Sequence, residues 1–249
     1  MRFNVRKPKI FIVGAGGTGG FVIDHLARLI ANEDIQIHLI DGDVVEHKNL
    51  TRQSFTVEDL GVRKAEAKKA HIDRTFGQSE NVQTKIAYVS DADEFLMYVL
   101  DNVETDETPI IVSAVDNVAT RRIINQTISD YPSLAIGIDS GNHDTGGQVV
   151  LFANQPVTVS DLLSKWEGLL PTMLELYPEM NNVEDVVPGE GTACEEHAES
   201  DPQSMMANVL NAVVIATLIQ NIIANHEITH NLWLTDASTG QINACLKLP

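Results

Sequence analysis

A glycine-rich stretch directly after an apolar run constrains this chain more than any other feature. The run covers residues 10–13 (Ile-Phe-Ile-Val), and the glycines that follow include Gly14, Gly16, Gly17 and Gly19. Apolar side chains then recur at helical spacing, so the order predicts a strand, a tight turn and a helix over 18–31. Glycine permits the turn and a close backbone approach, and the free N–H groups of a helix N-terminus attract anions. The turn therefore predicts a cradle for the phosphates of a nucleotide, with a tight turn that binds nothing as the alternative.

Strands and helices alternate through the first half of the chain. Further strands are predicted over 35–41, 82–89, 109–115 and 134–139, and helices over 64–76, 93–100 and 119–128. This alternation predicts a Rossmann-like, doubly wound α/β fold with a mainly parallel sheet. Three later strands, over 148–152, 232–235 and 241–246, adjoin glycine-rich turns and are expected to continue the sheet in the antiparallel sense.

The second half is less regular. We expect one domain over residues 1–249, with a nucleotide-binding half over 1–140 and a C-terminal half over 141–249. Residues 154–200 carry several prolines and an acidic stretch, which predicts a long surface excursion. The longest apolar segment, 205–223, is interrupted by Asn208 and Asn211, so it predicts a buried helix better than a membrane span.

Charge and cysteine content exclude some classes of partner and site. The net charge of −18, from 17 Lys and Arg against 35 Asp and Glu, argues against nucleic acid as a partner, because phosphate backbones bind clustered cations. Cys194 and Cys245 are the two cysteines, with no Cys-x-x-Cys pair, which excludes a structural zinc site built from cysteines. So few cysteines favour a reducing, cytoplasmic location.

Charged residues follow the second predicted strand. That strand ends at Asp41, 22 residues beyond Gly19, near the spacing at which an acid hydrogen-bonds a ribose hydroxyl in dinucleotide folds. Arg52 and Lys64 follow within 23 residues of Asp41, in loops expected to reach the crevice at the carboxyl ends of the strands. Arg52 could bind a triphosphate through its guanidinium fork, and Lys64 as a point charge. Such a clamp suits attack at an α-phosphate better than hydride transfer, because charge builds up on the leaving pyrophosphate.

An acid also ends the apolar strand predicted over 109–115. Asp116 follows this strand at the same predicted edge of the sheet. A carboxylate there can hold Mg²⁺, which prefers one or two carboxylates plus substrate oxygens. The alternative is an N-cap for the helical segment that starts near Asn117, and both roles could coexist.

Taken in order, these motifs resemble the ThiF/MoeB family of adenylyltransferases, which are related to ubiquitin-activating enzymes. The matching pieces are the glycine turn 14–19, Asp41-Gly-Asp43, Asn49-Leu-Thr-Arg52-Gln53, Gly61-Val-Arg-Lys64 and Val115-Asp116-Asn117. The second half resembles one branch, the ThiF family protein of PRTRC systems, in residues 141–150, 170–178, 193–194 and 239–243. The resemblance covers residues 9–249.

The resemblance implies an ATP-dependent reaction. In such enzymes ATP and Mg²⁺ bind in the crevice, and the C-terminal glycine carboxylate of a small ubiquitin-like protein attacks the α-phosphate to give an acyl-adenylate and pyrophosphate. The resemblance also implies a homodimer, in which an arginine can reach the partner's site; here Arg2 or Arg6 could fill that role. It assigns Asp41 to the ribose, Asn49, Arg52 and Lys64 to the phosphates and Asp116 to Mg²⁺, with Asp43, Gln53 and Asn117 completing the binding set.

Cys194 lies where relatives in this family place a reactive cysteine that receives the acyl group. The adjacent Glu195 and Glu196 would raise the pKa of its thiol, whereas His197 could serve as a base. A structural or incidental cysteine is the alternative. Cys245 falls in the last predicted strand and is expected in the core.

Two other functions stay open from the residues alone. An NAD(P)-binding oxidoreductase would use the glycine turn and Asp41, but it would give Arg52, Lys64 and Asp116 no role. A catalytically silent nucleotide-binding scaffold would keep every binding residue.

Overall fold

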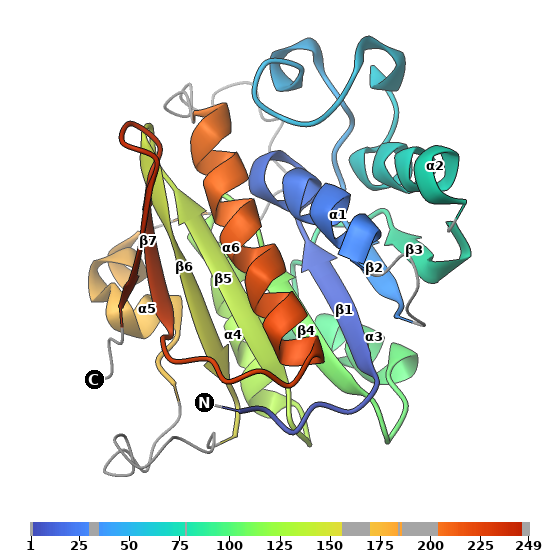
Figure 1. The fold of residues 1–249 in the computed structure, drawn as a ribbon. Coiled ribbons are helices and arrows are strands. Elements are labelled where there is room, and N and C mark those ends of the chain that lie inside the picture. Colours follow the sequence, from blue (N-terminus) through green and yellow to red (C-terminus); the bar gives the residue numbers. More distant parts are fainter. Residues whose placement is uncertain are drawn as a thin grey trace.

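A single mixed sheet organises the chain (Figure 1). The computed structural model describes residues 2–29, 35–77, 79–155, 170–183, 185 and 204–245. Eight strands in these residues pair in the order β3-β2-β1-β4-β5-β6-β7-β8. The strands β1 to β5 pair in the parallel sense, whereas β6, β7 and β8 are added in the antiparallel sense. Their bounds are β1 Pro8–Val13, β2 Ile37–Ile40, β3 Val82–Lys85, β4 Thr108–Ser113, β5 Ile136–Asn142, β6 Gly146–Ala153, β7 Leu232–Asp236 and β8 Gln241–Cys245.

This topology confirms the predicted fold class: a Rossmann-like, mainly parallel α/β sheet that antiparallel C-terminal strands continue. The strand predicted over 82–89 is shorter than expected. It pairs only with β2, whose last residue, Ile40, lies opposite Lys85. Beyond that point β3 has no neighbour to continue the ladder.

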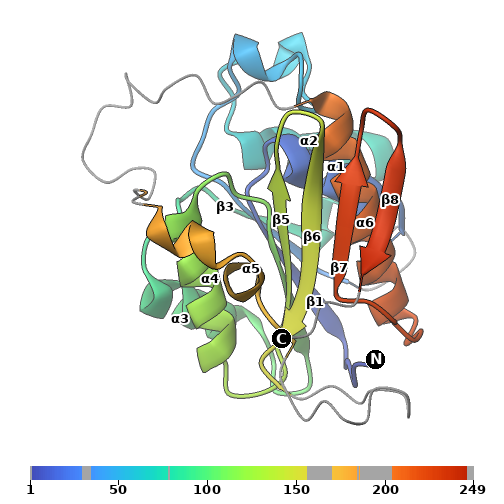
Figure 2. The same cartoon turned by 90° about the vertical axis from the view of Figure 1, so that its left-hand side faces the viewer.

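Helices cover both faces of the sheet. The helices α1 and α6 lie side by side on one face, and α3 and α4 pack on the other (Figure 1, Figure 2). Figure 2 also shows the β7–β8 hairpin continuing the sheet beyond β6. The bounds are α1 Gly17–Leu29, α2 Lys64–Phe76, α3 Ala92–Asn102, α4 Val118–Asp130, α5 Met173–Leu176 and α6 Met205–Ile223.

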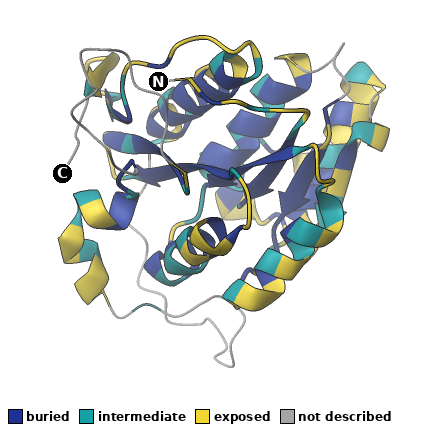
Figure 3. Cartoon of the chain, turned by 90° about the horizontal axis from the view of Figure 1, so that it is seen from below, coloured by how far each residue is buried: buried dark blue, intermediate teal, exposed yellow. Residues whose placement is uncertain are grey.

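The core lies on both faces of the central strands. Ile10 and Ile12 of β1, with Ile110 and Val112 of β4, are fully buried. In Figure 3 these strands form a dark blue layer between helices whose outer faces are exposed. Parallel strands that helices cover on both faces appear in sequence as continuous apolar runs, which is why these two were predictable. Full burial of each isoleucine contributes about 1.5–3 kcal/mol.

The apolar helix α6 buries one face against the rest of the fold, and Asn208 and Asn211 lie on that face. Of the described helices, α6 alone is long and apolar enough to cross a membrane by length and composition. In the fold it packs against α1 and strands β5, β6 and β7. Asn211 is fully buried, accepts a hydrogen bond from the Thr235 hydroxyl (2.6 Å) and donates to Ser140 Oγ (3.0 Å). These polar contacts fix α6 to the sheet.

In the described part of the surface excursion predicted over 154–200, the first residues pack on the core, whereas Glu179 and residues 181–183 are exposed. Residues 170–183 contain α5 and a 3-10 turn, and Leu170 and Met173 belong to the main core. A capping box starts α5: the Thr172 hydroxyl accepts from the Glu175 N–H, and the Glu175 carboxylate accepts from the Thr172 N–H. The Thr-x-x-Glu pattern of a capping box is present in the sequence, but prolines on both sides of it favoured an irregular segment over a helix.

Candidate active site

The glycine turn between β1 and α1 has no room for side chains at two positions. Gly14 has a φ of +91°, and a Cβ there would lie 2.5 Å from the carbonyl oxygen of Ala114 in the β4 loop. A Cβ at Gly19 would lie 1.8 Å from the carbonyl oxygen of Gly14. The absence of both side chains lets α1 start close to the ends of β1 and β4. The N-terminal N–H groups of α1 thus lie at the carboxyl edge of the parallel sheet, where ligands bind in this fold.

Asp41 ties the loop after β2 to this turn. One carboxylate oxygen accepts a hydrogen bond from the Ala15 N–H (2.7 Å), and the other accepts from the Asp43 N–H (2.7 Å). Burial raises the pKa of Asp41, and the Lys64 charge opposes that rise. Each oxygen retains acceptor capacity, so the predicted contact with a ribose hydroxyl is compatible with this second, structural role.

Lys64 and Asp43 form an ion pair. The Lys64 ammonium donates to Asp43 Oδ2 at 2.7 Å, and the Tyr88 hydroxyl donates to the other oxygen. Lys64 is 7% exposed. Burial acts to raise the pKa of Asp43, but the charge and hydrogen bond of Lys64 outweigh it, and the pKa lies below its ordinary value. The lysine predicted as a phosphate ligand is thus held at the sheet edge by an acid from the same motif set.

The loop that carries Asn49, Arg52 and Gln53 runs alongside the glycine turn. Asn49 is buried, and its side-chain oxygen accepts from the Glu46 N–H (2.8 Å), which fixes the 3-10 turn His47–Asn49. Arg52 is half-buried, and within the described part of the chain its guanidinium has no ion-pair or hydrogen-bond partner. A cation in this state is available for an anionic ligand.

Gln53 carries the clearest indication of a ligand. Its amide lies against Gly16, where an added Cβ would be 3.4 Å from Nε2. Its Oε1 is buried and has no hydrogen-bond partner among the described residues. Buried polar atoms are normally paired, and an orphan at a glycine turn is consistent with a partner that binds there.

Asp116 and Asn117 have separate roles at the end of β4. Asn117 is the N-cap of α4, because its side-chain oxygen accepts from the Thr120 N–H at 2.8 Å. The N-cap role that was the alternative for Asp116 therefore belongs to Asn117. Asp116 is exposed and has no ion pair or hydrogen bond to another described residue. Its carboxylate is free to meet a cation, whereas Asn117 keeps its amide N–H groups and one lone pair of its side-chain oxygen for a nucleotide.

Asn208 of α6 joins the glycine turn, which the sequence did not suggest. Its side-chain oxygen accepts from the Thr18 hydroxyl (3.2 Å) and from the Asn142 amide, and its Nδ2 donates to the Arg52 carbonyl (3.3 Å). A Cβ at Gly17 would lie 2.7 Å from this Nδ2. The third glycine of the motif is therefore required by a residue far along the chain.

A buried ion pair beneath Asp116 was also missed. The Arg121 guanidinium bonds the Asp139 carboxylate, the Val115 carbonyl (2.6 Å) and the Ser140 carbonyl (2.7 Å). Burial raises the pKa of Asp139, and Arg121 opposes that rise. Arg121 thus connects the carboxyl ends of β4 and β5, and the one sequence signal was an acid at the end of a predicted strand.

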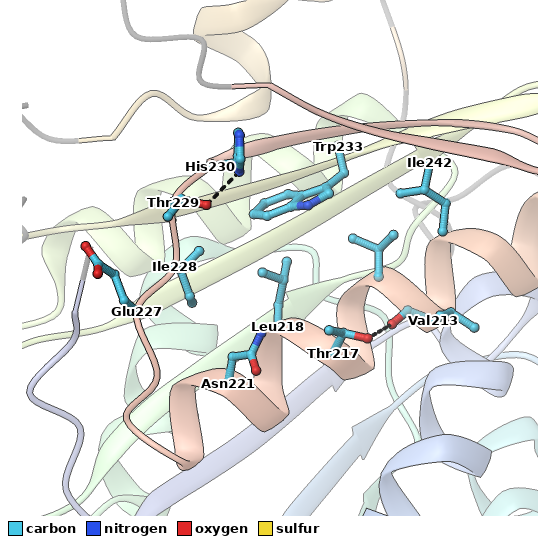
Figure 4. Close-up of a pocket in the computed structure, with 11 residues that line it drawn as sticks. Val213, Thr217, Leu218, Asn221, Glu227, Ile228, Thr229, His230, Trp233 and Ile242 are labelled. Carbon is cyan, nitrogen blue, oxygen red and sulfur yellow. Dashed lines mark hydrogen bonds between the residues drawn. The ribbon is translucent and has the colours of Figure 1, made fainter. Parts of the chain in front are cut away.

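Other expected features lie elsewhere or outside the described residues. A cavity of about 280 Å³ lies between α6 and the β7–β8 hairpin, lined by Val213, Trp233, Ile242 and neighbouring residues (Figure 4). None of the predicted site residues that the structure describes lines it. Cys194 lies outside the described residues. Within the described ranges, no cluster of three His, Cys, Asp or Glu could hold a metal ion, and Cys245 packs against the core.

Comparison with known proteins gives the family. The sequence model of the ThiF family matches residues 3–247. This chain belongs to the ThiF family. The predicted family is thereby confirmed, whereas closeness to the PRTRC branch stays a prediction. A ThiF-family assignment leaves the oxidoreductase alternative without support.

Several ThiF-related enzymes are similar over part of their length. The chain is 31% identical over 172 residues to the NEDD8-activating enzyme E1 catalytic subunit of Saccharomyces cerevisiae, covering 66% of this chain and 52% of that protein. It is 32% identical over 126 residues to the adenylyltransferase and sulfurtransferase MOCS3 of Aedes aegypti, covering 50% of this chain and 26% of that protein. The ThiF-family chain thus spans about half of the first relative and about a quarter of the second.

Solved structures have the same fold. A structure of E. coli MccB with AMPCPP and MccA has a TM-score of 0.61 at 18% identity, covering 98% of this chain and 64% of that one. A structure of PaaA has a TM-score of 0.60 at 20% identity, covering 96% and 72%. At these identities the likeness concerns the ThiF-type fold alone.

Proposed function

We propose that this chain is an ATP-dependent adenylyltransferase that activates the C-terminal carboxylate of a small ubiquitin-like protein. The two products are an acyl-adenylate and pyrophosphate. The observation that carries the proposal is that two neighbouring side chains beside the glycine turn have no partner among the described residues: the Arg52 guanidinium, and the buried Oε1 of Gln53 next to Gly16. The family match and the similarity to enzymes named as activating enzymes and adenylyltransferases support it.

The described residues fit ATP and Mg²⁺, the two ligands that the family implies. The N–H groups at the start of α1 and the Arg52 guanidinium would hold the phosphates, and Gln53 can turn its amide to donate or accept. Asp41 would bind the ribose. Asp116, which is exposed and has no partner in the part of the chain that the structure describes, would hold Mg²⁺, which supplies charge neutralisation for the phosphate oxygens when bound.

The chain's own groups then account for the reaction. A carboxylate oxygen of the partner forms a bond to the α-phosphorus, and the bond from that phosphorus to the bridging oxygen of pyrophosphate breaks. Negative charge moves onto the leaving pyrophosphate. Arg52 and Lys64 stabilise that charge. The bond to Asp43 sets the position of the Lys64 ammonium before the reaction and uses one of its three protons, which leaves two donors.

Assembly and location belong to the same proposal. A homodimer is supported by helix α6, which has no charged residue from Met205 to Ile223 and leaves Val213 39% exposed. In a chain of net charge −18, such a face avoids like-charge repulsion between copies. A cytoplasmic location, without nucleic acid or membrane partners, stays a prediction.

Isotope exchange tests the proposal. The full chain is incubated with ATP, Mg²⁺, labelled pyrophosphate and a candidate partner that ends in glycine. Label that enters ATP only when the partner is present supports adenylation. A partner that binds without exchange contradicts it and favours the silent scaffold, and tight NADH binding without ATP binding would favour an oxidoreductase.

A transfer step to Cys194 is the second candidate activity. Its support is the resemblance, which places a reactive cysteine of the family in this part of the sequence. A Cys194→Ala variant that still exchanges pyrophosphate but forms no thioester with the partner would assign the cysteine to the step after adenylation. An unchanged thioester yield would remove it from the reaction.

A further inference from the structure

Lys68 is a buried cation behind the loop that carries Arg52 and Gln53. It lies in α2 and is 1% exposed. Its ammonium is 3.0 Å from both carboxylate oxygens of Asp24 in α1 and 2.8 Å from the carbonyl oxygen of Ser54, and it also bonds the Ser54 hydroxyl. An ammonium has three protons, so Asp24 and Ser54 together use its whole donor capacity.

The surrounding structure is fitted to this ammonium. A Cβ at Gly20 would lie 3.2 Å from Lys68 Cε and 3.2 Å from Ser54 Oγ, so the glycine permits α1, α2 and the loop to meet. The Phe55 ring lies 5.1 Å from the ammonium. Burial lowers the pKa of Lys68, while Asp24 and Asp59 act to raise it.

These contacts link three elements of the proposed phosphate site. Asp24 lies in the helix that begins at the glycine turn, and Lys68 lies in the helix that begins at Lys64. Ser54 directly follows the Arg52-Gln53 pair. We infer that Lys68 is a positioning residue of the phosphate site, which fixes Arg52 and Gln53 relative to the glycine turn through Ser54.

The inference rests on the proposed function and specifies how its site is held. Lys68 is fully engaged by protein groups and does not touch the nucleotide. Near Arg52 the loop has few other restraints. The backbone N–H groups of Arg52 and Gln53 both donate to the Asn49 carbonyl, at 3.2 and 2.9 Å, and the Arg52 carbonyl accepts from the Asn208 amide. Loss of the Ser54 anchor would therefore let Arg52 and Gln53 shift while the rest of the fold stays.

The test compares two nucleotides on one pair of variants. Lys68→Met keeps the length of the side chain and removes the donors. The control Lys69→Met removes the neighbouring lysine, which is only partly buried and forms no ion pair or side-chain hydrogen bond with another described residue. Calorimetry measures the Kd of Mg·ATP and of AMP for the full chain, because AMP lacks the phosphates expected at Arg52. Hydrogen exchange reports on a peptide over 49–55.

Lys68→Met is expected to raise the Kd of ATP about tenfold, to leave the Kd of AMP within about twofold, and to speed exchange over 49–55. Lys69→Met should match the wild type. Equal weakening of ATP and AMP, or an unchanged Kd of ATP, would overturn the positioning role. A wild-type chain that binds no ATP would instead overturn the proposed function.

A second variant covers the case in which Lys68→Met does not fold. The double variant Asp24→Leu/Lys68→Met removes both charges together, and apolar replacement of a buried ion pair often preserves stability. It lacks the Ser54 anchor and is expected to lose the same selectivity for ATP over AMP. A folded double variant with wild-type ATP affinity would refute the role of Lys68.

Discussion

Replacing Gly19 by alanine tests the glycine turn more directly than any other change. A methyl group at this position would lie 1.8 Å from the Gly14 carbonyl oxygen and 3.3 Å from the Ala114 side chain. The first neighbour is backbone in a turn that Asp41 holds through the adjacent Ala15 N–H. The methyl group therefore has no flexible side chain to displace.

The required displacement can be worked out from that distance. Contacts closer than 3.0 Å are essentially unknown for real Cβ atoms, so the N-terminus of α1 must move about 1.2 Å away from Gly14. Overpacking of this kind destabilises a fold by about 1–3 kcal/mol. A 1 Å misplacement of reacting groups costs about 100-fold in rate. We therefore expect Gly19→Ala to lower pyrophosphate exchange about 100-fold and to weaken ATP binding.

Calorimetry for ATP, isotope exchange and urea denaturation measure these effects together. The matched control is Gly77→Ala, because Gly77 ends α2 with a φ of +65° and an added Cβ there would have no described atom within 4 Å. Alanine there costs about 1 kcal/mol of stability through the left-handed backbone alone. It should leave ATP affinity unchanged. Wild-type ATP affinity in a folded Gly19→Ala variant would refute the close-packed phosphate turn.

Three further predictions concern single side chains. Arg52→Ala should lower the exchange rate about 100- to 1,000-fold, whereas Lys48→Ala, which removes an exposed lysine of the same loop, should leave it unchanged. Asp116→Asn should abolish the gain in ATP affinity that Mg²⁺ gives, and calorimetry with and without Mg²⁺ checks this; an intact gain would remove Asp116 from the metal site. Burial, helped by Lys9, lowers the pKa of His38 from 6.5 to about 4, so the neutral histidine stabilises the fold above pH 6.5 and this contribution is lost as the pH falls towards 4. Urea denaturation should show that the free energy of unfolding falls by up to about 3 kcal/mol over that pH range. His38→Phe should reduce this pH dependence, and a variant with the same pH dependence as the wild type would show that His38 is not its cause.

Local patterns predicted the fold because the decisive elements are local. The apolar runs that became β1 and β4, and the turn from Gly14 to Gly19, each carry their signal within a few residues. The loop acids and cations were expected at one edge because parallel strands end together. Asp41, Asp43 and Lys64 do meet there, and the roles assigned to them stay predictions. The Thr172–Glu175 capping box was equally local and was overlooked.

Contacts between distant residues were not predictable from those patterns. Nothing near Lys64 indicates that Asp43 holds it, because the two meet only when β2 and α2 are packed. Lysine and arginine are ordinarily surface residues, so the burial of Lys68 and Arg121 depends on acids from other elements. Asn208 appeared in sequence as a polar interruption of an apolar helix, whereas the fold uses it as a contact for Gly17.

The bond between Thr18 and Asn208 spans 190 residues and has a consequence for synthesis. Ribosomes add about 5–20 residues per second, so the glycine turn emerges roughly 10–40 s before the asparagine that completes it. During that interval the first half of the sheet has no α6 to pack against α1. The nucleotide site is therefore among the last parts of the nascent chain to mature, and a pulse-labelled chain should become protected by ATP against proteolysis only after α6 has left the exit tunnel.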